Sequence, residues 1–390
     1  MPKIFVPRLI TDEALASFKE FPVLTISGPR QSGKTTLARH LFGGLAYFNL
    51  ENPDTLELIT SDPRAFLNRN SKGAILDEIQ KAPELLSYIQ TSVDENPECK
   101  FILTGSNQFS MLEKITQSMA GRTAILKLLP FCLDEISKVS PDLLAEELIY
   151  KGGLPVIYSE GRDPVRTYRN YYETYIERDV RSLINIRDLS LFRKFMRLCA
   201  GRTGQIFNAS QLANETGVAV NTIKSWISVL ETSFIIYMLP PWFDSITKRL
   251  IKSPKLYFYD VGLASYLLGI RNENHVQRDP LRGALFENLV MNELIKRYFN
   301  SGLSPEVYFY RDKNVNEIDA LLNQARKFIP VEIKASETFH GDFLKNLNYI
   351  RKIYPNRIIR SILVYAGQEE QENEDISIIN YKKLYHKIKP

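Results

Sequence analysis

The stretch FPVLTISGPRQSGKTTLARHLF, residues 21–42, decides the fold of the first third of the chain. An apolar, β-rich run leads into a loop that fits the pattern G-x-x-x-x-G-K-[ST] at every fixed position, and an apolar helical pattern follows. This order of strand, loop and helix separates a phosphate-binding loop from a chance glycine turn. Glycines let the backbone wrap phosphate groups, and the N–H groups at the helix start supply positive potential. We therefore predict that ATP or ADP binds at Gly28, Pro29, Arg30, Gln31, Ser32, Gly33, Lys34, Thr35 and Thr36.

A second stretch, GAILDEIQ (residues 73–80), supplies the acidic strand end that ATP hydrolysis also needs. It begins with apolar residues, as a strand buried on both faces requires. We expect Asp77, through water, and the Thr35 hydroxyl to hold Mg²⁺, while Lys34 reaches the β- and γ-phosphates. Glu78 is placed to orient or deprotonate the attacking water. Lys34 and Glu78 are therefore the predicted catalytic residues of an ATPase.

Five apolar runs alternate with helical patterns in the first third, at residues 23–26, 46–50, 74–78, 101–105 and 124–128. This alternation predicts a parallel α/β sheet whose strand ends converge on the nucleotide. Ser106 or Asn107, after the fourth run, is placed to sense the γ-phosphate. Arg122, before the fifth run, is either an arginine finger acting on a neighbouring subunit of a homo-oligomer or an ordinary surface arginine.

Length and composition limit the class of protein. The 390 residues predict two or three domains, and 44% hydrophobic with 24% charged residues is the balance of a globular chain. No apolar run approaches the length of a membrane span, and the N-terminus lacks the apolar core of a signal peptide. The 3 cysteines are widely spaced and the 4 histidines scattered, which argues against a disulfide scaffold and a Cys/His zinc site. These features predict a cytoplasmic protein without a membrane partner.

Positive charge is concentrated in the middle of the chain. Residues 161–255 carry 15 Lys and Arg against 8 Asp and Glu, a local net charge of +7. A local basic excess is typical of a nucleic-acid-binding segment, and a solvated helical face gives the same pattern. Charge alone leaves both interpretations open.

The segment NASQLANETGVAVNTIKSWISVLETSFIIYML, residues 208–239, has the pattern of a helix-turn-helix followed by a strand. Ser210 and Asn221 are the predicted caps of the two helices, and Gly217 permits the turn between them. One small contact residue and two core residues fall where this motif needs them: Ala213, Ile223 and Trp226. The runs FIIYML (residues 234–239) and KLYFYD (residues 255–260) read as the strands of a wing, which predicts a winged helix.

The second helix of this motif exposes polar residues, as DNA-reading helices often do. The predicted exposed positions are Asn221, Thr222, Lys224, Ser225 and Ser228. Winged helices also dock on proteins, so the partner is either DNA, which the local charge favours, or a protein.

The last third predicts elements in the order α-β-β-β-α-β. These are an amphipathic helix, a strand, a hairpin of EIDALL and FIPVEIKA, a helix and a strand, at residues 286–299, 307–313, 317–335, 340–355 and 360–367. This is the core order of the PD-(D/E)XK nuclease fold, which the region resembles. The resemblance implies a metal-dependent site that cleaves DNA.

Three polar residues sit inside the predicted hairpin. A hairpin centred between residues 325 and 326 places Asp319 across from Glu332, with Lys334 on the same face. Two carboxylates and an ammonium group at this separation can hold Mg²⁺ or Mn²⁺ and orient a water. Asp319 and Glu332 are thus the predicted metal ligands and, with Lys334, catalytic residues. Glu287, on the preceding helix, is a candidate extra ligand, as in relatives of this fold.

A simpler alternative exists for the same hairpin. Glu332 and Lys334 can be a solvated pair produced by ordinary strand alternation. Asp319 resists this interpretation, because it alternates onto the same face as Leu321. The choice between an active and an inactive nuclease-like site stays open.

As a whole, the chain resembles the bacterial and archaeal AAA-type ATPases that end in domain of unknown function 4143. The resemblance covers nearly the whole length and is carried by GPRQSGKTT, ILDEIQ, LTGSN, AGR, GGLP, TYIERDV, LFENLV and EIDALL with PVEIKA. The adjacent Asp77 and Glu78 are similar to those of AAA+ ATPases, whose strand order implies an extra strand between those of the phosphate loop and of Asp77. The second sensor arginine of that group is not identified in this sequence, which puts ring assembly in doubt.

The predicted architecture is an α/β multidomain protein. It has an AAA+-like P-loop ATPase domain at residues 1–150, a helical linker and winged helix at 151–275, and a nuclease-like domain at 276–390. We expect a Mg²⁺-dependent ATPase that acts on DNA, and the question whether it also cleaves DNA with a metal ion stays open. The alternatives are a nucleotide-switched regulator or scaffold with an inactive nuclease-like domain that binds DNA or a protein, and a protein-docking ATPase that never contacts nucleic acid.

Overall fold

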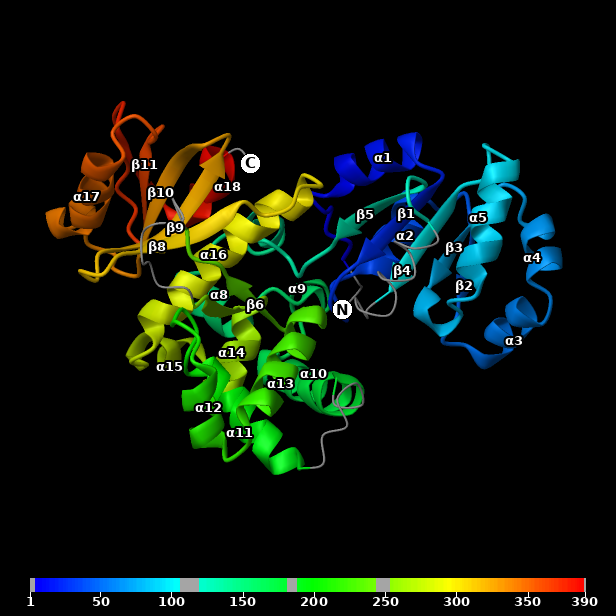
Figure 1. Cartoon of the computed structure of the whole chain (residues 1–390), viewed down its shortest axis with the longest axis horizontal. Helices are drawn as coiled ribbons and strands as arrows, with labels where there is room; N and C mark the ends of the chain where they lie inside the picture. Colours follow the sequence, from blue (N-terminus) through cyan, green and yellow to red (C-terminus); the bar gives the residue numbers. More distant parts are fainter. Residues whose placement is uncertain (1–3, 106–118, 181–187, 243–252, 389–390) are drawn as a thin grey trace.

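The computed structural model describes residues 4–105, 119–180, 188–242 and 253–388. Its first part is a parallel sheet of β1 (Val23–Ser27), β2 (Ala46–Asn49), β3 (Ala74–Asp77), β4 (Phe101–Gly105) and β5 (Thr123–Lys127). All five predicted strands are present, in the spatial order β2-β3-β4-β1-β5 (Figure 1). The predicted extra strand is confirmed, because β4 lies between β1 and β3.

Helices cover both faces of this sheet and bury two separate hydrophobic cores, because successive strand residues point to opposite faces. On one face, Leu24 and Ile26 share a core with residues of α1 (Thr11–Glu20) and α2 (Lys34–Leu41). On the other face, Val23 belongs to a core that includes residues of η1, α3, α4 and α5, which span Ile79–Lys81, Pro53–Ser61, Pro63–Arg69 and Leu85–Glu95. The N-terminus of α2 is thereby held beside the carboxyl end of β1.

The middle of the chain is helical and contains the predicted winged helix-turn-helix. Its elements before the wing are α7 (Leu133–Ser137), α8 (Ala145–Lys151), α9 (Pro155–Ser159), α10 (Pro164–Tyr171), the π-helix η2 (Tyr172–Val180), α11 (Leu189–Ala200), α12 (Ala209–Thr216) and α13 (Val220–Thr232). The wing pairs β6 (Ile236–Leu239) with β7 (Lys255–Phe258) in antiparallel orientation. Gly217 follows α12 with φ +87°, which confirms its role in the turn.

The two predicted caps of this motif are each wrong by two residues. The Asn208 side chain caps α12 by accepting a hydrogen bond from the Gln211 N–H at 3.0 Å, so Ser210 lies inside the helix. The N-cap position of α13 is Ala219, so Asn221 lies in its first turn. Asn208 and Ser210 are both good capping residues, so propensity alone does not choose between them, whereas α13 begins without a side-chain cap.

The packing of the motif agrees with prediction. Ala213, Ile223 and Trp226 are buried. Four of the five polar positions predicted on the second helix are exposed and Thr222 is half-buried; the exposed ones are Asn221, Lys224, Ser225 and Ser228.

The last part of the chain is a six-stranded sheet in the order β12-β13-β11-β10-β9-β8. The strands are β8 (Val307–Arg311), β9 (Glu317–Gln324), β10 (Lys327–Lys334), β11 (Ser361–Tyr365), β12 (Gln371–Glu372) and β13 (Ile376–Asn380). The predicted α-β-β-β-α-β order is present, since α16 (Arg282–Asn300) precedes β8 and α17 (Lys345–Ile353) lies between β10 and β11. The shorter helices are α14 (Val261–Leu267), α15 (Glu273–Arg278), η3 (Gly341–Leu344), η4 (Tyr381–Lys383) and α18 (Leu384–Lys387).

The β9–β10 hairpin has the predicted register. Lys327 pairs with Gln324, and Val331 pairs with Ala320, so the turn is centred between residues 325 and 326. Both turn residues have positive φ, 49° at Ala325 and 75° at Arg326, as expected of a two-residue type I′ turn.

The middle and last parts of the chain share one hydrophobic core. This core includes Trp226 of α13, Val290 of α16 and Val331 of β10. Helix α16 runs from the helical lobe along the six-stranded sheet (Figure 1). The predicted domain boundaries after residues 150 and 275 fall inside α8 and α15, and the three-domain division remains a proposal.

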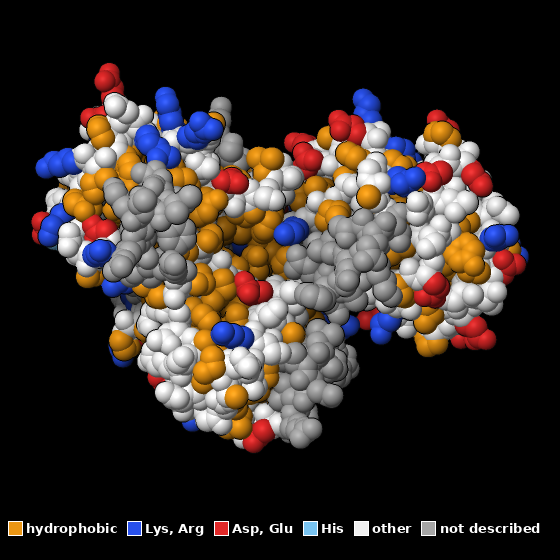
Figure 2. Space-filling view, in the orientation of Figure 1, with side chains coloured by type: hydrophobic (Ala, Val, Ile, Leu, Met, Phe, Trp, Pro, Cys, Tyr) orange, Lys and Arg blue, Asp and Glu red, His pale blue; other side chains and the backbone are white. Residues whose placement is uncertain are grey.

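The surface carries no single-sign patch on the face seen in Figure 2, where basic and acidic side chains of the described residues are interspersed. Within the described ranges, no helix is both long and apolar enough to cross a membrane.

Two glycines with positive φ give a test of the fold. Gly73 (φ +100°) precedes β3, and a Cβ there would lie 1.6 Å from the backbone oxygen of Lys100. We expect Gly73→Ala to lower the thermal unfolding midpoint strongly, because backbone must separate beside the junction of β3 and β4. At Gly217 nothing lies within 4 Å of such a Cβ. Gly217→Ala should therefore cost only the left-handed backbone strain of about 1–2 kcal/mol. Equal midpoints for the two variants in thermal denaturation would contradict this packing.

Candidate functional site

The phosphate-binding loop has the backbone geometry that its glycines predict. Gly28 has φ +149°, and a Cβ there would lie 2.1 Å from the Leu128 backbone oxygen. Gly33 has φ +94° and is the N-cap residue of α2. The loop therefore lies between the end of β1 and the start of α2, where N–H groups at the helix N-terminus favour an anion.

Lys34 is buried and folds back onto the loop. Its Nζ donates hydrogen bonds to the backbone oxygens of Gly28 at 2.9 Å and Pro29 at 2.8 Å. Burial lowers the pKa of Lys34 to about 8, and the carboxylates of Glu78 and Asp77 offset part of this effect. A phosphate beside Lys34 would favour its charged form further.

Asp77 is the centre of the polar contacts at the strand ends. The Thr35 hydroxyl donates to its two carboxylate oxygens at 3.0 and 2.9 Å, and the Tyr47 hydroxyl donates to Oδ2 at 2.8 Å. Thr104, at the end of β4, donates a third hydroxyl hydrogen bond to Oδ1. Burial and the hydrogen bond to Asp77 raise the pKa of Tyr47. The Thr35 hydroxyl and the Asp77 carboxylate are hard oxygen donors and fit a Mg²⁺ ion.

Glu78 adopts a backbone conformation that is unusual for its residue type. It has φ 59° and ψ 47°, in the left-handed region. The Gln80 side-chain amide donates a hydrogen bond to the Glu78 carboxylate. Non-glycine residues held in this region often lie at functional sites. The strained turn places the carboxylate in the same cavity as Lys34 and Thr35.

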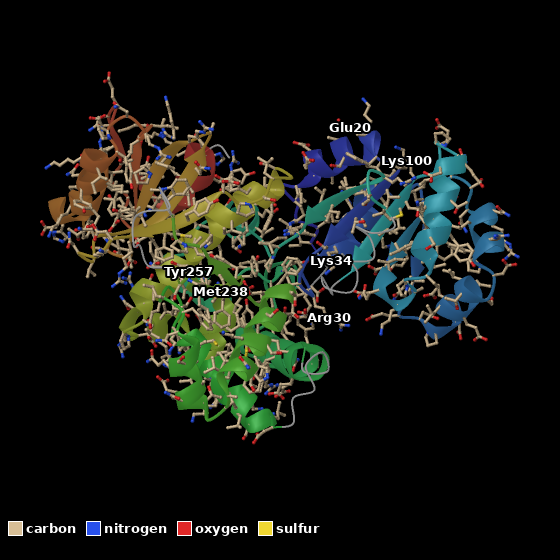
Figure 3. The ribbon with its side chains drawn as sticks, in the orientation of Figure 1. Glu20, Arg30, Lys34, Lys100, Met238 and Tyr257 are labelled. Carbon is tan, nitrogen blue, oxygen red and sulfur yellow. The ribbon has the colours of Figure 1, made fainter. Side chains whose placement is uncertain are left out.

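A cavity of about 370 Å³ unites Lys34, Thr35 and Glu78 with three further segments of the chain. The loop, Thr36 and Glu78 line one side, and Phe5, Val156 and Tyr175 line others. Lys34 and Arg30 lie where the sheet domain faces the helical lobe (Figure 3). The site is therefore formed by both the sheet domain and the middle of the chain.

Arg8 joins the N-terminal segment to the loop and to the cavity wall. Its guanidinium donates to the Ser32 backbone oxygen at 2.7 Å and forms a buried ion pair with Glu135 at 2.9 Å. It also lies over the ring of Phe131, 4.9 Å from its centroid, and Phe131 lines the cavity. Nothing in the sequence pattern marked Arg8, because its partners lie more than 20 residues away.

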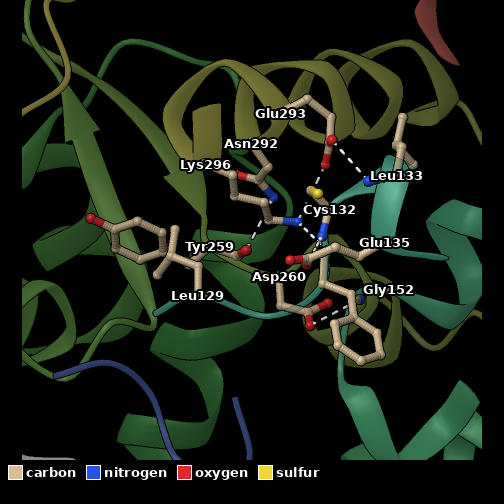
Figure 4. A network of polar contacts seen from close by, with 12 residues as sticks. Leu129, Cys132, Leu133, Glu135, Gly152, Tyr259, Asp260, Asn292, Glu293 and Lys296 are labelled. Atoms are coloured by element: carbon tan, nitrogen blue, oxygen red, sulfur yellow. Dashed lines mark hydrogen bonds and ion pairs between the residues drawn. The ribbon is translucent and has the colours of Figure 1, made fainter. Parts of the chain in front are cut away.

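A buried network ties the cavity wall to α16 (Figure 4). Lys296 donates to the Phe131 backbone oxygen at 2.6 Å, and Glu293 accepts from the Leu133 N–H at 2.9 Å. Asp260 accepts hydrogen bonds from the N–H groups of Gly153 at 3.2 Å and Gly262 at 2.8 Å. The segment that follows β5 is thereby attached to the middle and to the last part of the chain.

Three further residues were predicted to act on the nucleotide, and only Arg122 is among the described residues. Ser106 and Asn107 lie outside the described residues. Arg122 precedes β5 at the amino ends of the parallel strands, whereas the loop follows the carboxyl end of β1. Its guanidinium pairs with Asp94 at 2.6 and 2.9 Å. Arg122 is therefore remote from the nucleotide site of its own chain, and action on a neighbouring subunit stays a prediction.

The predicted carboxylates of the last third come together, as the register required. Asp319 lies across from Glu332, and its Oδ2 accepts a hydrogen bond from the Ile333 N–H at 2.8 Å. Lys334 pairs with Glu332 Oε1 at 2.7 Å, and Asn346 donates to the same oxygen at 3.2 Å. The structure thus contradicts the solvated-pair alternative for Glu332, which is 2% exposed.

Two residues of the wing strand β7 join this group without having been predicted. Lys255 pairs with Glu287 at 3.2 Å and also with Glu317. The Tyr257 hydroxyl donates to Glu287. The wing therefore supplies a buried cation to the carboxylates of α16 and β9.

Burial and neighbouring charges have opposite effects on the pKa values of the carboxylates in this group. Burial raises the pKa of Glu332 and of Glu287, and the Asp319 carboxylate raises both further. Burial also raises the pKa of Asp319, while Lys255 and Lys334 oppose this rise. Lysines thus occupy the electrostatic role that a divalent cation could fill.

Glu287, Asp319 and Glu332 do not converge as a ligand set. Across residues 4–105, 119–180, 188–242 and 253–388, no group of three or more His, Cys, Asp or Glu side chains is arranged to hold a metal ion. Glu332 Oε2 is buried and has no hydrogen-bond partner among the described residues. The predicted metal site is thus not formed in this conformation, and one oxygen remains available to a ligand.

The lowered pKa of Lys34 predicts a pH dependence of nucleotide affinity. Phosphate groups are fully ionised above pH 8, so the charge on Lys34 decides the trend. ADP affinity, measured by calorimetry without added Mg²⁺, should be nearly constant between about pH 7 and 8 and fall by up to about tenfold per pH unit above pH 8. Lys34→Arg, whose guanidinium does not titrate, should bind more weakly but without this slope. A flat profile for the unaltered chain would refute the prediction.

Glu332 predicts a pH dependence of stability. Its pKa is about 8 in the folded chain, against an ordinary value of 4.5 for a glutamate side chain. The folded state therefore retains a proton that the unfolded state loses, and stability is lost as the pH rises from about 4.5 to 8. In buffer with a chelator, Glu332→Gln should unfold at a higher temperature than the unaltered chain at pH 8.5, and the difference should shrink at pH 5. A difference of the same size at both pH values would exclude this origin.

Three family models match successive parts of the chain. These are an AAA domain at residues 20–137, a domain of unknown function (DUF8612) at residues 143–274, and a domain of unknown function (DUF4143) at residues 282–384. The first match covers the loop and the strand that ends in Asp77. The chain therefore carries an AAA-type ATPase domain.

Relatives extend this result over most of the length. The chain is 30% identical over 325 residues to the uncharacterized protein Rv2008c of Mycobacterium tuberculosis and to the uncharacterized protein Mb2031c of Mycobacterium bovis, which covers 81% of this chain and 71% of each relative. Among solved structures, it is similar to the Walker-type ATPase PABY2304 of Pyrococcus abyssi, with 16% identity, a TM-score of 0.47, and coverage of 68% of this chain and 98% of that chain. The chain belongs to the family of AAA-type ATPases whose C-terminal part is the DUF4143 domain.

Proposed function

We propose that the protein is a Mg²⁺-dependent ATPase that couples ATP hydrolysis to action on DNA. One observation carries the ATPase part: the Asp77 carboxylate accepts the Thr35 hydroxyl while Lys34, Thr35 and Glu78 line one cavity. In this proposal Lys34 holds the β- and γ-phosphates, and Thr35 and Asp77 hold the metal ion, which neutralises charge on the phosphates. Glu78 accepts a proton from the attacking water.

Tyr47 and Thr104 have a supporting role in this proposal. Tyr47 donates to one oxygen of the Asp77 carboxylate and Thr104 to the other, so the carboxylate keeps a fixed orientation beside the Thr35 hydroxyl. A carboxylate held by neighbouring hydroxyls is pre-organised for its ligand.

The DNA part of the proposal rests on the middle of the chain. The helix-turn-helix presents polar side chains on α13, and residues 161–255 carry a net charge of +7. Both features favour contact with a polyanion. The wing is joined to the carboxylates of the last part through Lys255, so a bound nucleic acid would lie near both modules.

The proposal also includes cleavage of DNA with the help of a metal ion. Asp319 and Glu332 face each other across the hairpin, and Glu332 Oε2 has no partner among the described residues. Displacement of Lys334 or Lys255 would free these oxygens for Mg²⁺ or Mn²⁺. Lys334 would then position the attacking water.

A second candidate function is a nucleotide-switched regulator or scaffold. It is favoured by the pairing of the same carboxylates with Lys255 and Lys334, which leaves their charge already compensated. In that case the last part of the chain binds DNA or a protein partner without cleaving it.

The ATPase proposal is tested by the rate of ATP hydrolysis with Mg²⁺, alone and with single-stranded, duplex and branched DNA. We expect basal hydrolysis that one DNA form stimulates. Lys34→Ala should reduce the rate by about 100-fold or more, as for loss of a charged transition-state contact. A basal rate that no DNA form changes would favour the regulator. Hydrolysis that persists in pure Lys34→Ala protein would refute the assigned site.

Cleavage is tested separately. Incubation of DNA with Mn²⁺ should yield products with the unaltered chain and none with Glu332→Ala, while both hydrolyse ATP. Glu20→Ala, at the exposed end of α1 in the sheet domain, removes the same charge and is a matched control that should leave both activities unchanged (Figure 3). If the Glu332→Ala variant cleaved DNA as fast as the unaltered chain, the cleavage would be assigned to a contaminant.

A further inference from the structure

One side chain connects the nucleotide cavity with the helix-turn-helix. Tyr175 lies on the π-helix η2 and lines the cavity with its neighbour Thr174. The guanidinium carbon of Arg30, in the phosphate-binding loop, lies 5.7 Å from the centroid of the Tyr175 ring. The ring is therefore a wall of the site, beside a cation of the loop itself.

The other end of Tyr175 reaches the motif that we expect to bind DNA. Its hydroxyl donates a hydrogen bond of 3.0 Å to the backbone oxygen of Ser233. Ser233 is the C-cap residue of α13, the second helix of the motif. A shift of the ring in the cavity would therefore be transmitted to the end of this helix by one hydrogen bond.

The junction that receives this hydrogen bond is strained. Phe234, directly after Ser233, has φ 56° although it is not a glycine, and it is buried. The wing strand β6 begins two residues later, at Ile236. A left-handed aromatic residue persists only where its surroundings hold it, so such a junction can take a second conformation when one restraint is altered.

The element that carries Tyr175 is also unusual. η2 is a π-helix of nine residues. π-Helices are rare in proteins, and those that occur often lie at functional sites. The Tyr175 ring packs against that of Tyr171 in α10, with ring centroids 5.3 Å apart. The hydrogen bond that restrains Ser233 thus comes from a π-helix and not from a regular α-helix.

We propose that Tyr175 contacts the bound nucleotide with its ring and reports occupancy of the site to α13 and the wing through its hydroxyl bond to Ser233. This inference rests on the nucleotide binding proposed above. It assigns to one residue both a share of nucleotide affinity, through the ring, and the coupling to the helix-turn-helix, through the hydroxyl.

The chain contains its own reporter for this coupling. It has 2 tryptophans, and Trp226 lies on α13, packed against Phe192 and Phe195 with centroid separations of 5.3 and 5.1 Å. The other, Trp242, contacts Phe328 in the last part of the chain. Trp242→Phe therefore leaves fluorescence from the helix-turn-helix alone.

In the Trp242→Phe chain, addition of ADP or a non-hydrolysable ATP analogue should change the Trp226 emission, while calorimetry measures binding. Tyr175→Phe keeps the ring and removes the bond to Ser233, so nucleotide should still bind but the Trp226 response should be lost. Tyr175→Ala should lose the response and also weaken binding by about three- to tenfold, as expected for one aromatic contact.

Tyr172→Phe is the matched control, because it also removes a hydroxyl from this π-helix. The Tyr172 hydroxyl has no hydrogen-bond partner among the described residues. This variant should keep the full Trp226 response. The same coupling can be checked in the chain that keeps both tryptophans. The measurement is amide hydrogen exchange at residues 233–236. Nucleotide should change exchange there in the unaltered chain and not in Tyr175→Phe.

The outcomes separate this inference from the function on which it rests. Failure of any nucleotide to bind the unaltered chain would overturn both. Binding with a full Trp226 response in Tyr175→Phe, or unchanged affinity in Tyr175→Ala, would overturn only the role of Tyr175.

Discussion

The buried ion pair between Arg8 and Glu135 is the contact on which the nucleotide site most depends. Both side chains are almost inaccessible to solvent, and two charges are removed from water only where further hydrogen bonds satisfy them. Arg8 also donates to the backbone oxygens of Ser32 and Leu129, and Glu135 accepts from the N–H groups of Leu9 and Cys132. Loss of either partner would leave an uncompensated charge in the interior. The N-terminal segment, the phosphate loop and the start of α7 therefore keep one relative position.

This constraint extends from the loop to the rest of the chain. Phe131 and Leu133, beside the ion pair, hold Lys296 and Glu293 of α16 through their backbone groups. The same helix carries Glu287, which meets Lys255 of the wing. One helix thus bears groups directed to the nucleotide cavity at one end and to the carboxylates at the other. The cavity and the carboxylate group are joined by buried polar contacts instead of a loose linker.

The sequence predicts this fold wherever local patterns determine the structure. The five strands and the loop follow from apolar runs and glycines, and the hairpin register follows from alternation about a two-residue turn. The predicted cap of α12 was wrong because Asn208 and Ser210 are equivalent in propensity, and that of α13 was wrong because this helix begins at Val220 without a side-chain cap. Arg8, Tyr47, Tyr175 and Lys255 were missed for another reason: each acts on residues distant in sequence, and their environments exist only after folding. The predicted metal ligands lie together as expected, but lysines that the pattern could not place compensate their charge.

The shared core of the middle and last parts has a consequence for how such chains can be inherited. Val290 and Val331 pack in the same core as Trp226, so this core needs both regions, although the last part also has a separate core that includes Leu347 and Leu363. A recombination event that transferred only the region after residue 275 would expose one half of that core and cut α15. The sheet domain, in contrast, encloses its own two cores. The middle and last regions must therefore be passed on as a pair, and an exchanged sheet domain must bring Arg8 to a chain that keeps Glu135.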